Sequence, residues 1–141
     1  MKTYTVGFIF NPDFSKVLLV EKNRPDWQKG KLNGVGGKIE PGEESSACIA
    51  REVFEETSLK TRPEDWTFVG EMKTADWRVD VYTMIHRGDL GDAKTVTDEK
   101  IEWNSAKPLP ERALSNLRWL VPLSMDKLQH NQFHTCSVHY S

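Results

Sequence analysis

The segment that most constrains this chain is a glycine-rich loop followed directly by a run of helix-forming residues that is rich in acids. It spans residues 31–60 and reads KLNGVGGKIEPGEESSACIAREVFEETSLK. Nothing between residues 44 and 58 breaks a helix, so the pattern predicts a helix over that range. Its less polar positions recur at helical spacing and are expected to face the core: Ala47, Ala50, Phe54 and Thr57.

Three glutamates crowd one side of this expected helix. At roughly 100° per residue, Glu55 falls about 60° to one side of Glu52 and Glu56 about 40° to the other. Glu52 and Glu56 form a like-charge pair that destabilises an isolated helix by roughly 0.2–0.5 kcal/mol. Arg51, four residues before Glu55, can orient that carboxylate through an ion pair. A solvated acidic face is the simplest interpretation, but the glycine loop beside it favours a site for Mg²⁺ or Mn²⁺, which prefer oxygen ligands.

The stretch from residue 37 to residue 59 resembles the Nudix box, GX5EX7REUXEEXGU, in which U is an aliphatic residue. The matching positions are Gly37, Glu43, Arg51, Glu52, Val53, Glu55, Glu56 and Leu59. Ser58 departs from the pattern because it stands where the box has its last glycine. A glycine there eases a left-handed helix end, so we expect a modest structural cost and an intact set of carboxylates.

The resemblance implies a Nudix hydrolase, an enzyme that uses a divalent cation to cleave a nucleoside diphosphate linked to another group X. The metal ligands implied are Glu52, Glu55, Glu56 and the backbone carbonyl of Gly36. Arg51 would orient Glu55, and Glu43 would brace the loop or reach the metal through water. Lys38, next to the paired glycines, is a candidate phosphate contact or else a solvated surface lysine. The general base is left open; Glu99 is a candidate base or additional ligand, with an ordinary surface acid as the alternative.

Outside the box, the chain resembles MutT-type enzymes that hydrolyse oxidised purine nucleoside triphosphates. The similar stretches are LNGVGGKIEPGE, DEKIEW, RWLVPL and QFH. The resemblance implies hydrolysis of a purine nucleoside triphosphate, normal or oxidised, to the monophosphate and pyrophosphate. Asn33 has the donor and the acceptor needed to read a purine edge. Asn116 is a second candidate reader, and it stands where the vertebrate enzymes have acids.

Tryptophans are the candidate groups for stacking on a base. Trp27, Trp77 and Trp119 are the possible stacking residues, although tryptophans more often pack in a core or at its rim. Other substrates stay open within the same chemistry, namely ADP-ribose, dinucleoside polyphosphates, nucleotide sugars and capped RNA. A nucleotide-sensing module that has lost catalysis is the alternative from a different class, and the complete set of box carboxylates argues against it.

The rest of the chain predicts a mixed α/β fold. Strand-like runs are expected over residues 4–10 and 16–21, joined as a hairpin, and over 66–73, 77–86 and 100–105, with a final edge strand in the tail FHTCSVHY. Residues 108–129 show helical patterning interrupted by Pro122, which predicts two helical pieces or one kinked helix. We therefore expect one domain over residues 1–141, with the Nudix fold of an α/β/α sandwich around a mixed sheet.

Charge and cysteine content limit the partners and the compartment. A formal net charge of −2 gives no electrostatic footprint for duplex nucleic acid. The two cysteines, Cys48 and Cys136, suggest free thiols in a reducing compartment, with Cys48 a small buried group. No segment has the pattern of a signal peptide or the length of a membrane span. We therefore expect a cytoplasmic protein that binds a nucleotide and no membrane, with the oligomeric state left open.

Overall fold

The computed structural model describes residues 1–141 and contains eight strands, two helices and three short 3₁₀ segments. The strands are β1 (Lys2–Phe10), β2 (Lys16–Glu21), β3 (Leu32–Asn33), β4 (Val35–Lys38), β5 (Thr67–Lys73), β6 (Trp77–Ile85), β7 (Ile101–Ser105) and β8 (Cys136–His139). The helices are α1 (Ser45–Thr57) and α2 (Leu117–Gln129), and the 3₁₀ segments are η1 (Asp26–Gln28), η2 (Pro63–Asp65) and η3 (Leu90–Asp92).

All eight strands belong to one mixed sheet. The order along its main path is β3-β2-β1-β6-β5-β8, with β4 pairing to β1 and β7 pairing to β2. The β1–β6 and β5–β8 pairs are parallel and the others are antiparallel. The predicted hairpin is confirmed by the antiparallel β1–β2 pair, and the predicted final edge strand is confirmed as β8.

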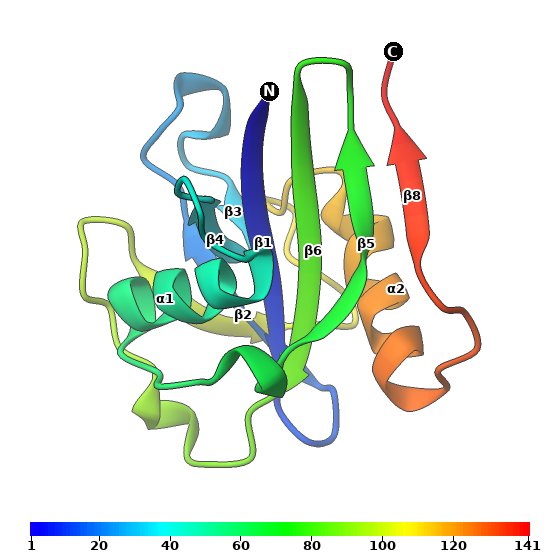
Figure 1. The fold of residues 1–141 in the computed structure, drawn as a ribbon. Helices are drawn as coiled ribbons and strands as arrows, with labels where there is room; N and C mark the ends of the chain where they lie inside the picture. Colours follow the sequence, from blue (N-terminus) through cyan, green and yellow to red (C-terminus); the bar gives the residue numbers. More distant parts are fainter.

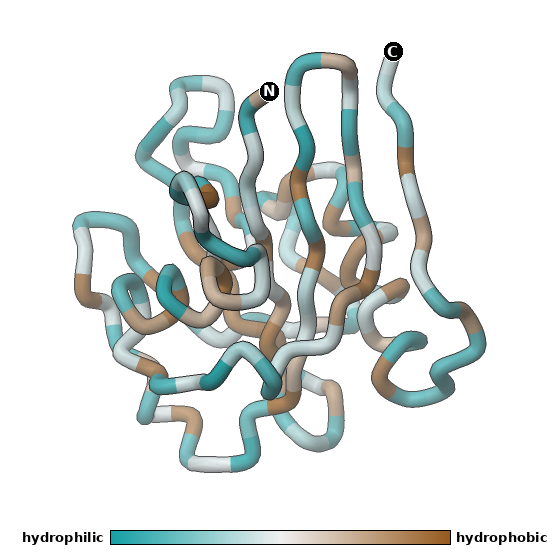
Figure 2. Tube along the Cα trace, in the orientation of Figure 1, coloured by the Kyte–Doolittle hydropathy of each residue, from teal (hydrophilic) through white to brown (hydrophobic).

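The two helices cover opposite faces of this sheet (Figure 1), which confirms the predicted sandwich. Alternation along β1 explains the arrangement, because successive side chains of a strand point to opposite faces. Val6, Phe8 and Phe10 join the core under α2, whereas Ile9 joins the core under α1. Figure 2 shows that hydrophobic segments gather mainly in the strands and hydrophilic segments in the peripheral loops.

The bounds of α1 agree with the predicted helix to within one residue, but the face that it buries was predicted only in part. Ala50 and Thr57 are buried as expected, whereas Phe54 is 47% exposed. Ile49 and Val53, which were not predicted to face the core, are fully buried. Apolar spacing alone could not decide between two neighbouring stripes of this helix, and the β-branched stripe is the one that packs on the sheet. The side of α1 that carries Glu52 consequently turns toward the glycine strand β4, while Glu55 stays exposed.

The C-terminal helix is shorter than its pattern predicted. Residues 108–116 are not helical, and α2 is a single helix that begins at Leu117 and contains Pro122. Leu117, Leu120 and Val121 pack into the core under α2. No helix is both long enough and apolar enough to cross a membrane.

Candidate active site

Arg51 is the centre of the charged network on α1. Its guanidinium donates to both carboxylate oxygens of Glu43, at 2.8 and 3.0 Å, and to Glu52 Oε1 at 3.0 Å. It also donates to Glu55 at 3.2 Å and to the carbonyl of Lys38 at 3.1 Å. The bidentate bond from Arg51 lowers the pKa of Glu43 to about 2. The Arg51 guanidinium therefore links three carboxylates, from α1 and the loop before it, to the end of β4.

Glu52 lies directly over the glycine strand. A Cβ added at Gly37 would lie 2.5 Å from the carboxyl carbon of Glu52, so a side chain there would push this flexible carboxylate away from its present position. The neighbouring Gly36 is more restricted, because a Cβ there would overlap the backbone carbonyl of Thr5 on β1. Burial raises the pKa of Glu52 even though the Arg51 charge opposes that shift. The predicted contact between the glycine loop and the acidic helix is thus present in the fold.

Glu56 is the acid of this group whose environment most disfavours its negative charge. Its Oε2 atom is buried and has no hydrogen-bond partner. Burial raises the pKa of Glu56 to about 7, and the charges of Glu52 and Glu99 add to the shift, while Lys22 and the backbone of Gly36 oppose it. A buried acceptor without a partner is costly, and each such group in a native fold calls for an explanation.

Glu99 comes from the loop before β7 and lies close to this cluster. Its carboxylate accepts from Lys22 Nζ at 3.0 Å and from the backbone N–H of Asn23 at 2.7 Å. Burial would raise the pKa of Glu99, but these two donors outweigh it and hold the pKa below its usual value. Glu99 is therefore a buried, oriented carboxylate, which makes it a better candidate for a base or ligand than an ordinary surface acid.

The donor set of this cluster fits a divalent cation. Carboxylate oxygens are the ligands that Mg²⁺ and Mn²⁺ prefer. Burial, with a smaller contribution from neighbouring carboxylates, raises the pKa values of Glu52 and Glu56, and a bound cation would stabilise both in their charged forms. The unpartnered Oε2 of Glu56 is available as such a ligand. No three acidic, histidine or cysteine side chains are already gathered in metal-binding geometry, and Arg51 pairs with Glu52 and Glu55. Glu55, 52% exposed at its side chain, is the outermost of the three box acids.

Two further residues near the glycine strand have the environments that their expected roles require. Lys38 ends β4, is exposed and makes no ion pair, so its ammonium is free to meet an anion. Cys48 is fully buried, with its Sγ atom 3.3 Å from Thr5 Oγ1 and 3.5 Å from the carbonyl of Lys38. This confirms the predicted buried thiol against the neighbouring loop.

Asn33 lies at the end of β3, next to the glycine strand. Its Oδ1 atom accepts from the backbone N–H of Gly34 at 2.8 Å, and its Nδ2 atom donates to Gln28 Oε1 at 3.3 Å. Asn33 lies three residues before Gly36, so their Cα atoms are at most about 11 Å apart. Such a separation would let one nucleotide reach from Asn33 to the carboxylate cluster.

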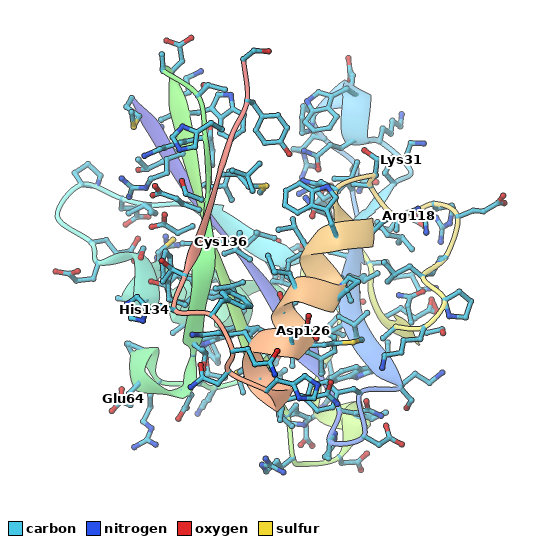
Figure 3. The ribbon with its side chains drawn as sticks, turned by 90° about the vertical axis from the view of Figure 1, so that its right-hand side faces the viewer. Lys31, Glu64, Arg118, Asp126, His134 and Cys136 are labelled. Carbon is cyan, nitrogen blue, oxygen red and sulfur yellow. The ribbon has the colours of Figure 1, made fainter.

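Asn116 precedes the first turn of α2. Its Nδ2 atom lies 3.8 Å from the sulfur of Met72, and its Oδ1 atom is buried without a hydrogen-bond partner. The segment before α2 runs beside β3, because Leu32 and Ala113 form a parallel bridge. Figure 3 shows the same proximity, with Lys31 and Arg118 at one end of the molecule. The fold therefore brings the two predicted amide readers, Asn33 and Asn116, to the same end.

The three candidate stacking tryptophans differ in their surroundings. Trp27, on η1, is 70% exposed, and Trp119, on the first turn of α2, is 37% exposed. Trp77 is half-buried and its ring packs against Tyr140, with a centroid separation of 5.6 Å. Trp27 and Trp119 are thus open to a ligand, whereas Trp77 already has an aromatic partner.

Lys22 and Gln28 are the residues of this region that the sequence did not single out. Lys22 pairs with Glu99 and Gln28 contacts Asn33. Both lie in or beside the polar loop between β2 and β3, where no motif marks them. Only the folded path of that loop, which returns onto β3, reveals their positions.

Comparison with known proteins places these features in a family. The NUDIX domain model matches residues 1–134. A MutT NUDIX hydrolase from Burkholderia pseudomallei superposes with a TM-score of 0.70 and 19% identity, covering 86% of this chain and 96% of that chain. A MutT structure from work on Aliivibrio salmonicida and Vibrio cholerae gives 0.68 and 20%, covering 89% and 98%. The MutT protein of Methanosarcina mazei gives 0.67 and 20%, covering 91% and 95%. At these identities the structures show a shared fold.

Proposed function

Because the chain belongs to the NUDIX domain family, and is a Nudix pyrophosphohydrolase, we propose that it hydrolyses purine nucleoside triphosphates, normal or oxidised, with a divalent cation. The products are the nucleoside monophosphate and pyrophosphate. Mg²⁺ or Mn²⁺ is the proposed cofactor. The observation that carries the proposal is the buried, unpartnered Oε2 of Glu56 beside the glycine strand, with Glu52 as its charged neighbour.

The carboxylates have separate proposed roles. Glu52 and Glu56, together with Glu55 and the carbonyl of Gly36, would hold the cation. A cation bound there supplies charge neutralisation for the polyphosphate and lowers the pKa of a water nucleophile. Arg51 keeps Glu52 and Glu55 oriented toward the strand, because its guanidinium contacts both carboxylates.

Two residues complete the phosphate side of the proposed site. Glu99 is proposed as the general base or as an additional ligand, since it is buried and held by Lys22 and the Asn23 N–H. Lys38 is proposed to contact the phosphate chain, because its ammonium is exposed and unpaired at the end of β4. In this proposal the negative charge of Glu99 serves the water or the cation, and the positive charge of Lys38 binds the phosphate chain.

The nucleoside would bind at the neighbouring end of the sheet. Asn33 and Asn116 are proposed to read the base edge, and Asn116 Oδ1 is an acceptor that still lacks a partner. Trp27 and Trp119 are proposed to stack on the base, since both rings are accessible. The stretches outside the box that resemble MutT-type enzymes, LNGVGGKIEPGE and DEKIEW among them, support a nucleoside triphosphate over the other Nudix substrates.

The decisive test of the metal assignment is Glu56→Gln, with Glu64→Gln as the matched control on an exposed acid of η2. We expect Glu56→Gln to lower Mg²⁺-dependent kcat by about 10³-fold or more, because it removes a charged ligand oxygen. The variant should melt no earlier than the wild type without metal, since the change removes a buried repelling charge. It should also lose the rise in Tm that Mg²⁺ gives the wild type. Undiminished turnover in Glu56→Gln would refute the assignment.

A substrate panel tests the second half of the proposal. Normal and oxidised purine triphosphates, pyrimidine triphosphates, ADP-ribose and diadenosine polyphosphates are assayed with Mg²⁺ and with Mn²⁺. We expect purine triphosphates to have the highest kcat/KM and to release pyrophosphate. Asn33→Ala should raise KM for purine triphosphates more than for pyrimidine ones. A higher kcat/KM for ADP-ribose or a dinucleoside polyphosphate would overturn the substrate, and nucleotide binding without any turnover would indicate a sensor.

A further inference from the structure

Gln28 makes the only side-chain hydrogen bond between the loop after β2 and the side chain of Asn33. Its Oε1 atom accepts from Asn33 Nδ2 at 3.3 Å, and its own Nε2 atom donates to no protein group. Gln28 is half-buried, whereas Trp27 and Lys29 on either side of it are exposed. Its side chain is therefore the one in this turn that faces the site.

The backbone of the loop fixes where Gln28 sits. Its N–H donates to the carbonyl of Pro25 at 2.9 Å, and its carbonyl accepts from the N–H of Lys31 at 2.8 Å. The backbone N–H of Lys22 donates to the carbonyl of Lys31 at 2.9 Å, and this hydrogen bond closes the loop onto the start of β3. Gln28 thus reaches Asn33 from a turn that is hydrogen-bonded on both sides.

Two hydrogen bonds agree on which end of the Asn33 amide points where. The N–H of Gly34 donates to Asn33 Oδ1, so that end of the amide must be the acceptor. The Nδ2 end then faces Gln28, which accepts from it through Oε1. A rotation of the Asn33 amide by 180° would set Nδ2 against the Gly34 N–H and Oδ1 against Gln28 Oε1. Two donors would then face each other, and so would two acceptors.

The geometry points to Gln28 as a positioning residue for base selection, acting through Asn33. This inference rests on the proposed role of Asn33 in reading the purine edge. The Gly34 N–H holds the Oδ1 end of the Asn33 amide, and Gln28 adds a second restraint at the Nδ2 end. Together they leave the second Nδ2–H and the second lone pair of Oδ1 in fixed directions for the base. A base that matches this donor and acceptor arrangement binds without having to reorient the amide, so its KM is lower.

The test compares two substitutions that separate the contact with Asn33 from the rest of the side chain. Gln28→Leu removes the acceptor, while Gln28→Glu keeps an oxygen that accepts from Asn33 Nδ2. Lys29→Ala is the control, because it changes an exposed side chain in the same turn and leaves the hydrogen bond to Asn33 intact. KM and kcat are measured for dATP, dGTP, dCTP and dTTP with Mg²⁺, beside Asn33→Ala and the double variant Asn33→Ala with Gln28→Leu.

We expect Gln28→Leu to raise KM for the purine substrates about threefold to tenfold, with kcat and the pyrimidine KM values within about twofold of wild type. Gln28→Glu should keep the wild-type purine-to-pyrimidine ratio of kcat/KM, even if its charge raises every KM alike. The double variant should lose no more selectivity than Asn33→Ala alone, because Gln28 acts through that residue.

Three other outcomes overturn the inference in different ways. If Gln28→Leu keeps the wild-type purine-to-pyrimidine ratio of kcat/KM while Asn33→Ala loses it, Gln28 has no role in base selection and Asn33 remains the proposed base reader. If both Gln28→Leu and Gln28→Glu lose the purine-to-pyrimidine preference in kcat/KM, Gln28 contacts the base through Nε2 and does not act through Asn33. An unchanged ratio in Asn33→Ala removes the proposed base reader and the role of Gln28 together.

Discussion

The two ends of the candidate site are built differently. At the carboxylate end, Arg51 links Glu43, Glu52 and Glu55 to the carbonyl of Lys38 within one network. At the proposed nucleoside end, Asn33 has one side-chain partner, Asn116 has an unpartnered oxygen, and the two accessible tryptophans have no aromatic partner.

The difference separates what the fold itself depends on from what a ligand would complete. The carboxylate end must stay organised without a ligand, because its like charges would otherwise repel one another inside a partly buried site. The nucleoside end has little internal bonding to lose. Substitutions should therefore change stability at the first end and ligand affinity at the second.

Arg51→Ala should have the largest effect on stability. Removing this guanidinium leaves Glu43 and Glu52 partly buried without their cation, which should lower the free energy of unfolding by about 2–4 kcal/mol. Urea denaturation of the metal-free protein measures this. Arg62→Ala is the matched control, since its ion pair with Asp65 is exposed and should contribute less than about 1 kcal/mol. Equal losses in the two variants would remove the distinction between this network and an ordinary surface pair.

Glu43 should give the next largest effect, as a dependence of stability on pH. The Arg51 hydrogen bonds lower the folded-state pKa of Glu43 from 4.5 to about 2. A lowered carboxyl pKa stabilises the fold above the unfolded value, so this contribution is complete above pH 4.5 and disappears as the pH falls to about 2. We expect it to reach about 2 kcal/mol after allowance for partial solvent screening.

Glu43→Gln isolates that contribution from the other carboxylates. The difference in unfolding free energy between the wild type and the variant is measured by urea denaturation at several pH values from 6 to 2. We expect the difference to shrink through this acid range. A difference that stays constant with pH would mean that the Arg51–Glu43 pair does not stabilise the fold through its charge.

Trp27→Ala should have the smallest effect on stability and a visible one on affinity. The ring is 70% exposed and has no aromatic partner, so the free energy of unfolding should change by less than about 0.5 kcal/mol. Loss of one stacked base typically weakens binding by about 1–3 kcal/mol, so KM should rise at least about fivefold. An unchanged KM would exclude Trp27 from the nucleoside end and leave Trp119 as the stacking candidate.

Much of the fold could be predicted from the sequence because its signals are local. Residues 16–21 formed the predicted strand, and α1 begins and ends within one residue of its predicted bounds. The failures came from choices that local spacing leaves open. Phe54 is exposed because Ile49 and Val53 supply the buried stripe, and Pro108 and Pro110 precede a segment that does not become helical before Leu117.

The same reasoning divides the site. The carboxylate end lies within one contiguous stretch, so its residues and their spacing were visible together. The nucleoside end joins residues from β3, the loop before it and α2, and their proximity depends on the Leu32–Ala113 bridge. Lys22 and Gln28 belong to no motif, and their contacts with Glu99 and Asn33 arise only when the loop folds back.

The glycine strand and the end of α1 differ in how much sequence drift each can absorb. Ser58 adopts a left-handed conformation, with φ of 67° and ψ of −1°, while its N–H still bonds to the carbonyl of Phe54. That conformation costs a residue other than glycine about 1–2 kcal/mol of stability, which the rest of the fold compensates. At Gly37 any side chain would meet the Glu52 carboxylate. A change at position 58 therefore bears on the end of α1 alone, whereas a side chain at position 37 would displace the Glu52 carboxylate from its place over β4.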